Sequence, residues 1–595
     1  MPFDIENNIL LKYDDDGSEC VNIPADTEII GEYAFTGSEN VKKIIVPEGV
    51  RKIEQYAFWN CPQLKEIILP STLEEIARFA CWECGSLEYI KIPENVKVIG
   101  NAAFRECDML KYAELPDNMQ SIGSSAFSNC ISLESIVIPK GIKIIKQRTF
   151  YGCLALKSVT LPEGLEEIDE YSFEACRALD GLKLPDGVKT IGRHAFDTCR
   201  SLKNIDVPDS VLNIGSSAFI NTALINSAGQ PFVILGGGIL IHFNSEAETA
   251  DIPENVKIIG ERAFSYKKEL KTVNIPSGTQ RICEYAFESC EALEKAILPD
   301  SVKHLESHAF AGCHSLRTVV VPPNLETMGS DVFYDTPILN EAEGEFAVQS
   351  EKYLLKYRGF AAEAVLPENI EYICGGAFSG CDTVQRIEIP DSVRSIGANA
   401  FEWCRELSFA DIPESVVSIG AGAFAHCKTL TAKLHFGGEK NIGANAFFRG
   451  TRLIFDCGGR DFSVRLKTEF LSEKDENSYA LLDFAASPSA ELFEKLTEQN
   501  YKLPIALCFY EDNAAYSAYL AQNARNALIY AVDEEDVKLI DRLLSLNILS
   551  RDDVSAGTDY AIDCQKNEIQ TLLLRYKHEN WGDSAEARLD EKFRL

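Results

Sequence analysis

The sequence predicts a β-rich solenoid of 23-residue rungs with parallel strands, followed by an α-helical C-terminal domain or cap. Three observations predict this fold class. An aromatic residue recurs every 23 residues over most of the 595-residue chain. Each repeat carries a short run of alternating apolar and polar residues that ends at a proline, which is typical of a strand. The period is lost after the "FDCGG" segment at 455–459, and a helical pattern begins near residue 476.

One residue in each repeat, almost always phenylalanine, marks the period, and we call it the marker of its rung. Seventeen rungs fall into three blocks, which are separated by gaps of 45 residues. The markers are Phe35, Phe58, Cys81, Phe104, Phe127, Phe150, Phe173, Phe196 and Phe219, then Phe264, Phe287, Phe310 and Phe333, then Phe378, Phe401, Phe424 and Phe447. A repeat of this length buries little by itself, so neighbouring rungs must stack to form one continuous core.

The rung around Phe58 shows how a repeat is expected to fold. The L-x-x-I-x-L run at 64–69 predicts a strand with one buried face, and Pro70 ends it because proline cannot donate to a ladder. A second apolar pair, Val50 and Ile53, predicts a short extended stretch on the opposite wall. The "YAFWNC" segment turns the chain between the walls, and the marker fills the space between them.

Each block opens with an apolar island that predicts a hairpin-like start. The islands are "FDIENNILLKY", "FVILGGGILIHF" and "FAVQSEKYLLKY". They divide the chain into block 1 with its island (1–222), block 2 with its island (223–336), block 3 with its island (337–460) and a helical C-terminal region (461–595).

The repeat pattern C-x-x-L-x-x-I-x-I-P-x-x-V-x-x-I-G-x-x-A-F resembles the BspA-like, treponemal-type family of leucine-rich repeats. The resemblance covers roughly residues 1–450 and implies a leucine-rich-repeat solenoid. The family includes bacterial surface proteins and adhesins, so it also implies binding to host matrix or to other cells. Because the family is defined by its scaffold, the resemblance does not name a ligand.

The net charge of -33 argues against two classes of partner. Nucleic-acid binding needs clustered Lys and Arg to displace counterions, and anionic membranes attract basic surfaces. The N-terminus has no basic start and no long apolar run, which indicates no signal peptide. The most apolar stretch, residues 231–243, is too short to span a bilayer. We therefore expect a protein ligand, no nucleic acid and no membrane insertion.

Twelve of the nineteen cysteines lie in one column, three residues after the marker. They are Cys61, Cys84, Cys107, Cys130, Cys153, Cys176, Cys199, Cys290, Cys313, Cys381, Cys404 and Cys427. We expect a ladder of small buried thiols, since Cys packs as a small hydrophobe. Other residues occupy this column only in first or last rungs, namely Ser38, Thr222, Lys267, Thr336 and Gly450. Many free thiols favour a reducing compartment.

The strongest candidate for a metal-binding or catalytic site is the "KHLESHAFAGCH" segment, which holds His304, His308, Cys313 and His314. Its H-x-x-x-H spacing puts two ligands on one face only in a helix, whereas the repeat places His304 on a strand. A metal-binding or enzymatic protein that uses this cluster remains an alternative. The chain carries no nucleophile-elbow or kinase signature, so we expect neither an enzyme nor a cofactor.

The outward positions of each strand are expected eight and ten residues after the marker. In block 1 they give eight candidate partner-binding residues: Lys43, Ile45, Glu66, Ile68, Tyr89, Lys91, Tyr112 and Glu114. Adjacent tyrosines beside an apolar patch are typical of interface anchors. The alternative is that exposed strand positions favour Tyr, Ile and Thr for structural reasons alone.

The C-terminal region contains two similar amphipathic segments, in which Tyr530-Ala531-Val532 and Tyr560-Ala561-Ile562 recur after 30 residues. They resemble ankyrin-type helix pairs over about 60 residues. Such helices would cap the open end of the solenoid, form a second interaction module, or do both.

These features favour a non-catalytic protein-interaction scaffold that binds its partner through the stacked-strand face. A bacterial surface adhesin is the alternative that the family resemblance implies. The lack of a recognisable signal peptide and the many thiols favour the cytoplasm, while a cell-surface or secreted location follows from the resembled family.

Overall fold

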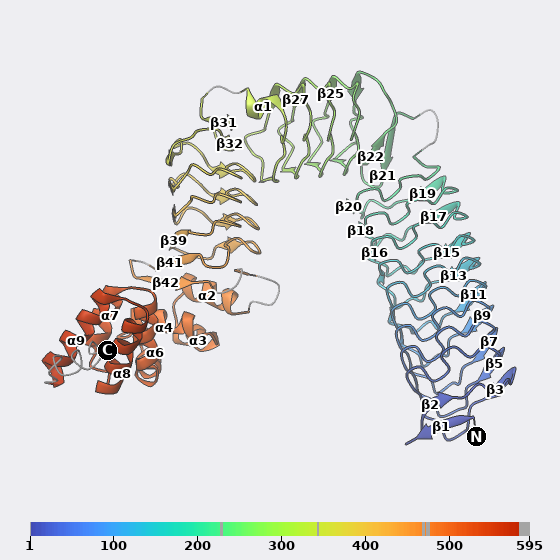
Figure 1. Ribbon diagram of the computed structural model, residues 1–595. Coiled ribbons are helices and arrows are strands. Elements are labelled where there is room, and N and C mark those ends of the chain that lie inside the picture. Colours follow the sequence, from blue (N-terminus) through green and yellow to red (C-terminus); the bar gives the residue numbers. More distant parts are fainter. Residues whose placement is uncertain are drawn as a thin grey trace. The chain divides into compact units, whose positions relative to one another are not determined.

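The computed structural model describes residues 2–225, 230–341, 344–457, 459–466, 470–471 and 476–581 (Figure 1). The chain forms two compact units, each described by itself. Unit 1 holds blocks 1 and 2 up to Asn340, apart from Met328–Asp331. Unit 2 holds Met328–Asp331 together with the chain from Glu341 onward.

Block 1 confirms the predicted solenoid with parallel strands. Each rung supplies a three-residue strand to one wall and a two-residue strand to another. The longer strands are β3 (Cys20–Asn22), β5 (Lys43–Ile45), β7 (Glu66–Ile68), β9 (Tyr89–Lys91), β11 (Tyr112–Glu114), β13 (Ser135–Val137), β15 (Ser158–Thr160), β17 (Gly181–Lys183) and β19 (Asn204–Asp206). The shorter ones are β4 (Ile29–Ile30), β6 (Lys52–Ile53), β8 (Glu75–Ile76), β10 (Val98–Ile99), β12 (Ser121–Ile122), β14 (Ile144–Ile145), β16 (Glu167–Ile168), β18 (Thr190–Ile191) and β20 (Asn213–Ile214).

The strand register follows the sequence period. In the pairing of β5 with β7, Ile44 lies opposite Ile67, its equivalent one rung later. The central residue of each longer strand in this pair is buried, and its two neighbours are more exposed. Because side chains alternate across a strand, one apolar residue per strand is enough to fix which face enters the core.

Block 2 and block 3 repeat this arrangement. Block 2 contains β23 (Thr249–Asp251), β25 (Thr272–Asn274), β27 (Lys295–Ile297) and β29 (Thr318–Val320), with β24 (Ile258–Ile259), β26 (Arg281–Ile282), β28 (His304–Leu305) and β30 (Thr327–Met328), and a short helix α1 (Pro337–Asn340) follows it. Block 3 contains β33 (Glu363–Val365), β35 (Arg386–Glu388), β37 (Phe409–Ile412), β39 (Thr431–Phe436) and β41 (Arg452–Cys457), with β34 (Tyr372–Ile373), β36 (Ser395–Ile396), β38 (Ser418–Ile419) and β40 (Asn441–Ile442).

The three apolar islands form antiparallel hairpins, as their patterns predict. They are β1 (Phe3–Glu6) with β2 (Ile9–Tyr13), β21 (Phe232–Leu235) with β22 (Ile239–Phe243), and β31 (Phe346–Gln349) with β32 (Tyr353–Tyr357). In each hairpin the second strand pairs in parallel with the first short strand of its block. A hairpin therefore takes the place of a preceding rung on that wall.

The marker side chains form a continuous ladder inside the solenoid. From Phe104 to Phe219 consecutive rings stack with centroids 5.3–5.8 Å apart. These rings are almost fully buried. Since burying one such side chain stabilises a fold by roughly 1.5–3 kcal/mol, the ladder is a main source of cohesion between rungs.

The cysteine column confirms the structural role predicted for it. All nineteen cysteines are free thiols. Cys130 donates its thiol hydrogen to the carbonyl oxygen of Phe104, the marker of the preceding rung, over 3.1 Å, and Cys153 does the same to Phe127. The same bond, 3.0–3.3 Å long, is made by Cys61, Cys84, Cys107, Cys130, Cys153, Cys176, Cys199, Cys290, Cys313, Cys404 and Cys427.

The exceptions in this column lie in the first or last rung of a block. Thr222 and Thr336 belong to the last rungs of blocks 1 and 2, and their hydroxyls donate to the markers of their own rungs. Cys381 is in the first rung of block 3, and its sulfur lies beside the Thr383 hydroxyl at 3.5 Å. In these two last rungs the bond is made within the rung, whereas an interior cysteine bonds to the marker of the preceding rung.

The C-terminal region differs in one respect from its predicted helical character. It begins with a strand, β42 (Asp461–Arg465), which pairs antiparallel with β41 and ends the sheet. Helices then start at Glu476, close to the predicted onset. They are α2 (Glu476–Ala486), α3 (Ala490–Lys495), α4 (Gln499–Cys508), α5 (Ala514–Gln522), α6 (Ala524–Asp533), α7 (Val537–Ser545), α8 (Arg551–Asp563) and α9 (Asn567–Trp581).

The first helices cover the end of the unit 2 sheet. The ring of Phe462 on β42 packs edge-to-face against Phe484 and Phe509, and the Tyr530 hydroxyl donates to the Ser463 carbonyl over 3.1 Å. Sheet and helices share one apolar core. The helices therefore act as a cap, because they cover a sheet end that would otherwise be open. Their similarity to ankyrin-type pairs stays a prediction.

Candidate binding surfaces

The outward side of the block 1 sheet, which we call the strand face, brings the predicted partner-binding residues together. These are Lys43, Ile45, Glu66, Ile68, Tyr89, Lys91, Tyr112 and Glu114, on β5, β7, β9 and β11. Tyr89 lies directly opposite Tyr112, and Lys91 opposite Glu114. The residues between them, such as Ile90, point into the core. Because the rungs stack, residues 23 positions apart in the sequence lie side by side and form a continuous surface.

The charged members of the strand face pair with each other. Lys43 lies 2.7 Å from Glu66, and Lys91 lies 3.2 Å from Glu114. Because both pairs are open to solvent, each contributes roughly 0–1 kcal/mol to stability. Their main effect is to neutralise charge on both sides of the tyrosines.

The Tyr89 phenol is held by the same charged group. Burial and a hydrogen bond to Glu114 raise the pKa of Tyr89 to about 12. Hydrogen bonds from Tyr89 and Lys91 in turn lower the pKa of Glu114. Near neutral pH Tyr89 is therefore protonated.

The exposed apolar part of the strand face centres on four side chains. Tyr89 is 38% exposed, Tyr112 47%, Ile68 40%, and Val137 on β13 63%. Ile45 and Lys43, which lie on β5, are half-buried and add less exposed surface. Apolar and aromatic side chains in one contiguous patch are the composition found at the centres of protein interfaces.

The rule for outward positions fails in the rung of Phe424, which corrects the expectation that every strand follows it. The positions eight and ten residues after this marker are Ala432 and Leu434, and both are fully buried. One residue fewer separates the marker from its strand, so Lys433 and His435 point outward instead. The strand registers agree, since β37 and β39 are offset by 22 residues rather than 23.

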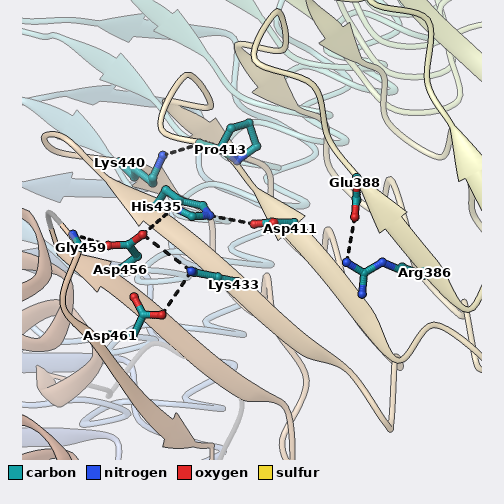
Figure 2. A network of polar contacts seen from close by, with 10 residues as sticks. All are labelled: Arg386, Glu388, Asp411, Pro413, Lys433, His435, Lys440, Asp456, Gly459 and Asp461. Atoms are coloured by element: carbon teal, nitrogen blue, oxygen red, sulfur yellow. Dashed lines mark hydrogen bonds and ion pairs between the residues drawn. The ribbon is translucent and has the colours of Figure 1, made fainter.

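This shift assembles a polar network that the sequence reasoning missed (Figure 2). His435 lies between two carboxylates, with Nδ1 2.8 Å from Asp456 and Nε2 2.8 Å from Asp411. Lys433 lies 3.2 Å from Asp461 and 3.8 Å from Asp456. Lys433, His435 and three carboxylates thus join β37, β39, β41 and β42.

The electrostatics of the network favour ionised carboxylates. Burial acts to raise the pKa of Asp456, but hydrogen bonds from Gly459 and His435 and the charge of Lys433 lower it overall. The polar groups of this network bond to one another, so it braces the terminal strands. A sequence signal existed in the Lys-x-His alternation on one strand, but its partners are set by register.

A second feature missed by the sequence reasoning is an aromatic corner in the first rungs. The rings of Tyr33, Tyr56 and Phe79 stack in parallel with centroids 5.0 Å apart. Trp59 and Trp82 stack beside them at 5.6 Å. The rings cover each other's faces and present their edges to solvent, so the corner mainly holds rungs together.

The structure does not bring the His304 cluster together. His304 on β28 contacts a threonine hydroxyl of the next rung at 3.0 Å, and His314 contacts an aspartate at 3.0 Å. The ring of His308 stacks on a tyrosine of the preceding rung, and Cys313 belongs to the buried thiol column. Over the described residues, no group of three or more His, Cys, Asp or Glu side chains is arranged to hold a metal ion.

Comparison with protein families identifies the repeat. The profile of the BspA type leucine rich repeat region matches residues 13–134, 120–231, 242–350 and 350–454. The chain belongs to the BspA-type leucine-rich-repeat family. The matches cover well over half of the chain and span all three blocks. No curated protein matches this chain significantly.

Several solved bacterial structures are similar to this BspA-type protein. A leucine-rich repeat protein from Bacteroides ovatus is 28% identical over 55% of this chain and 87% of its own, with a TM-score of 0.37. The T. pallidum leucine rich repeat protein is 30% identical over 30% of this chain and 86% of its own, with a TM-score of 0.29. A leucine rich cell surface protein from Faecalibacterium prausnitzii is 22% identical over 72% and 91%, with a TM-score of 0.28.

Among the helices that the structure describes, none is both long enough and apolar enough to cross a bilayer.

Proposed function

We propose that this protein is a non-catalytic interaction scaffold that binds a partner protein through the strand face, with Tyr89 and Tyr112 at the centre of contact. The observation that carries the proposal is the exposed apolar patch of Ile68, Tyr89, Tyr112 and Val137 on four consecutive strands. Extended surfaces of stacked strands are the usual binding sites of repeat proteins.

The geometry of the patch supports this proposal. Because its pKa is raised to about 12, the Tyr89 phenol is protonated at neutral pH and can donate a hydrogen bond to a partner. The ion pairs Lys43–Glu66 and Lys91–Glu114 flank the tyrosines and leave their rings as the main exposed apolar area. A partner that presents an apolar surface with a mixed polar rim is complementary to this arrangement.

Site-specific photo-crosslinking tests the proposal with a matched control. A benzoylphenylalanine replaces either Ile68 on the strand face or Val98 on the short strand β10, and both native side chains are 40% exposed. We expect a discrete crosslinked partner from position 68 and none from position 98. Tyr89→Ala with Tyr112→Ala should abolish the adduct, because these changes remove the central contacts.

Two results would reject the strand face as the binding site. The first is an identical adduct from positions 68 and 98. The second is an adduct at position 68 that persists in the double alanine variant, provided that the variant keeps the thermal unfolding of the parent.

We also propose that the protein acts in a reducing compartment, rather than at the cell surface as an adhesin. The thiol-to-carbonyl bonds of the cysteine column need reduced sulfur, since an oxidised thiol has no hydrogen to donate. Fractionation of cells with protease treatment of intact cells tests this location. Digestion of the protein on intact cells would support the adhesin alternative instead.

A further inference from the structure

A recess lies in unit 1 where block 1 ends and block 2 begins. It consists of a polar cleft of about 710 Å³ and an adjoining apolar pocket of about 230 Å³. The two cavities share Gly215, Ser217, Glu261 and Arg262 on their walls. The two cavities therefore adjoin, one polar and the other apolar.

The recess exists because a hairpin interrupts the stacking of rungs. Sheet pairing ends at β20, and a new sheet begins with β21 and β22. Within block 1, the amides of Ser125, Phe127 and Asn129 donate to carbonyls of the following rung. The corresponding amides of the last rung belong to Ser217, Phe219 and Asn221, and no backbone acceptor for them occurs among the described residues. This edge offers main-chain donors to an extended segment.

The cleft carries an excess of carboxylates. They are Glu167, Asp169, Glu170, Glu261 and Glu284. In the part of the chain that the structure describes, none of these five lies within ion-pair distance of a Lys, Arg or His side chain. Cations elsewhere in the solenoid usually have a carboxylate on an adjacent rung, as Lys65 has Glu88 and Lys271 has Glu248.

The basic residues of the cleft are already engaged. Arg193 donates to the Tyr171 hydroxyl over 2.7 Å, and Arg262 pairs with Glu288, which lies outside the cleft. Burial raises the pKa of Glu261, although Ser216 of block 1 offers it hydrogen bonds. The cleft is thus complementary to a cation rather than to an anion.

The pocket next to the cleft suits an aliphatic side chain. Its walls include Ile214, Phe219, Ile220, Ile225 and Ile241. Ile220 is 44% exposed, so the pocket opens to solvent. A volume near 230 Å³ accommodates one leucine-sized or isoleucine-sized group.

We propose that this recess binds an extended segment of a partner protein in which a basic residue lies close to an aliphatic one. The guanidinium or ammonium group enters the cleft among Glu170, Glu261 and Glu284, and the aliphatic side chain fills the pocket. Carbonyl groups of the segment accept hydrogen bonds from the open edge of the last rung. The site is separate from the strand face, so neither proposal depends on the other.

Labelled peptides test the site on the full chain. The probes are fluorescein-labelled serine heptapeptides that carry one leucine and one arginine separated by zero, one or two serines. We expect at least one spacing to bind with a measurable change in fluorescence anisotropy. Replacing its arginine by glutamate, or its leucine by serine, should weaken binding on the order of tenfold or more, since each removes one of the two contacts.

Protein variants separate the site from general attraction to an acidic surface. Glu261→Gln with Glu284→Gln should weaken the best peptide on the order of tenfold, because two cleft charges are lost. The matched control, Glu74→Gln with Glu94→Gln, removes two exposed carboxylates from block 1 rungs remote in sequence and should leave affinity within twofold of the parent.

Three outcomes would overturn the proposal. In the first, no spacing of leucine and arginine binds. In the second, the glutamate peptide binds as well as the arginine peptide. In the third, the control variant loses as much affinity as the cleft variant, which would show only non-specific attraction. Circular dichroism melting of each variant establishes that the fold is kept.

Discussion

The thiol hydrogen of Cys130 is donated to the carbonyl oxygen of Phe104 over 3.1 Å, and the two residues are 26 positions apart in adjacent rungs. The same bond recurs along each block and stops where a block ends. It ties the buried cysteine column to the stacked phenylalanine ladder, so two sequence columns form one cohesive element.

Replacing an interior cysteine should destabilise block 1. Cys130→Ala removes a buried donor and leaves a small void, so we expect a loss of about 1–2 kcal/mol in the free energy of unfolding. Urea-induced unfolding measures the loss. Cys381→Ala is the control, since this thiol is only half-buried and contacts the Thr383 hydroxyl rather than a marker carbonyl, and its loss should stay below about 0.5 kcal/mol. Equal losses at both positions would contradict the role assigned to the ladder bond.

The titration of Tyr89 should depend on Glu114. Burial and the hydrogen bond to Glu114 raise the pKa of Tyr89 to about 12. The stability that this shift provides is present below the ordinary value of 10.0 and is lost as pH rises through about 12. In Glu114→Gln the apparent pKa of Tyr89 should fall, because the negative partner is gone. Carbon-13 NMR of labelled tyrosine measures both values, with Glu88→Gln as a control that should leave Tyr89 unchanged.

Lys440 should give unit 2 a stability that rises with pH in the alkaline range. Its ammonium donates to the carbonyl oxygen of Pro413 at 3.2 Å (Figure 2). It also donates to the carbonyl oxygen of Glu414 at 3.2 Å, and burial lowers the pKa of Lys440 to about 8. Between about pH 8 and the ordinary value of 10.5, the unfolded chain holds a proton that the folded chain lacks. The free energy of unfolding therefore gains a contribution as pH rises through this window.

Guanidinium unfolding at pH 7.5, 9 and 10 checks the Lys440 prediction against Lys440→Met. The variant should show a smaller rise in stability with pH than the parent, because it has no group to deprotonate there. A parallel rise in both proteins would mean that Lys440 titrates normally.

The network around His435 should make unit 2 sensitive to acid. Hydrogen bonds and nearby cations lower the pKa of Asp456. Its contribution to stability is full above the ordinary value of 3.8 and is lost as pH falls through the lower folded value. Asp456→Asn should cost about 1–3 kcal/mol at pH 6, because it leaves His435 and Lys433 with a weaker partner. Thermal unfolding from pH 6 to pH 2.5 measures the difference, and it should shrink at the acid end.

Asp382→Asn serves as the control for Asp456, since Asp382 is exposed and lies outside the network. Its stability should stay within about 0.5 kcal/mol of the parent at every pH. A loss at Asp456 that does not shrink in acid would assign the effect to packing rather than to charge.

The fold could be predicted because its information is local and repeated. A marker every 23 residues fixes one rung length, and alternation around residues such as Ile67 fixes which face is buried. The patterns of the three islands predicted hairpins, and the regular spacing of the cysteines predicted a column of buried, packed thiols. For the same reason, the 23-residue period alone places Tyr89 beside Tyr112, as the strand register confirms.

Sites that depend on a break in the period could not be predicted in this way. The shift of one residue before β39 turns Lys433 and His435 outward, and their partners Asp411 and Asp456 then follow from strand register. The recess at Glu261 depends on how a hairpin replaces a rung between two blocks. A periodic pattern gives the neighbours of a residue only while the period holds.

The sequence by itself determined the solenoid, its rung length, the buried columns and the candidate residues of the strand face. Tertiary structure alone decided how His435 is bracketed by two aspartates and, among the residues that the structure describes, which carboxylates have no ion pair and which amides have no backbone acceptor. The physical reason is the separation along the chain of the residues that interact. Burial patterns are set by side-chain alternation within a rung, whereas charge pairing and cavities are set by atoms that meet only after rungs and blocks have stacked.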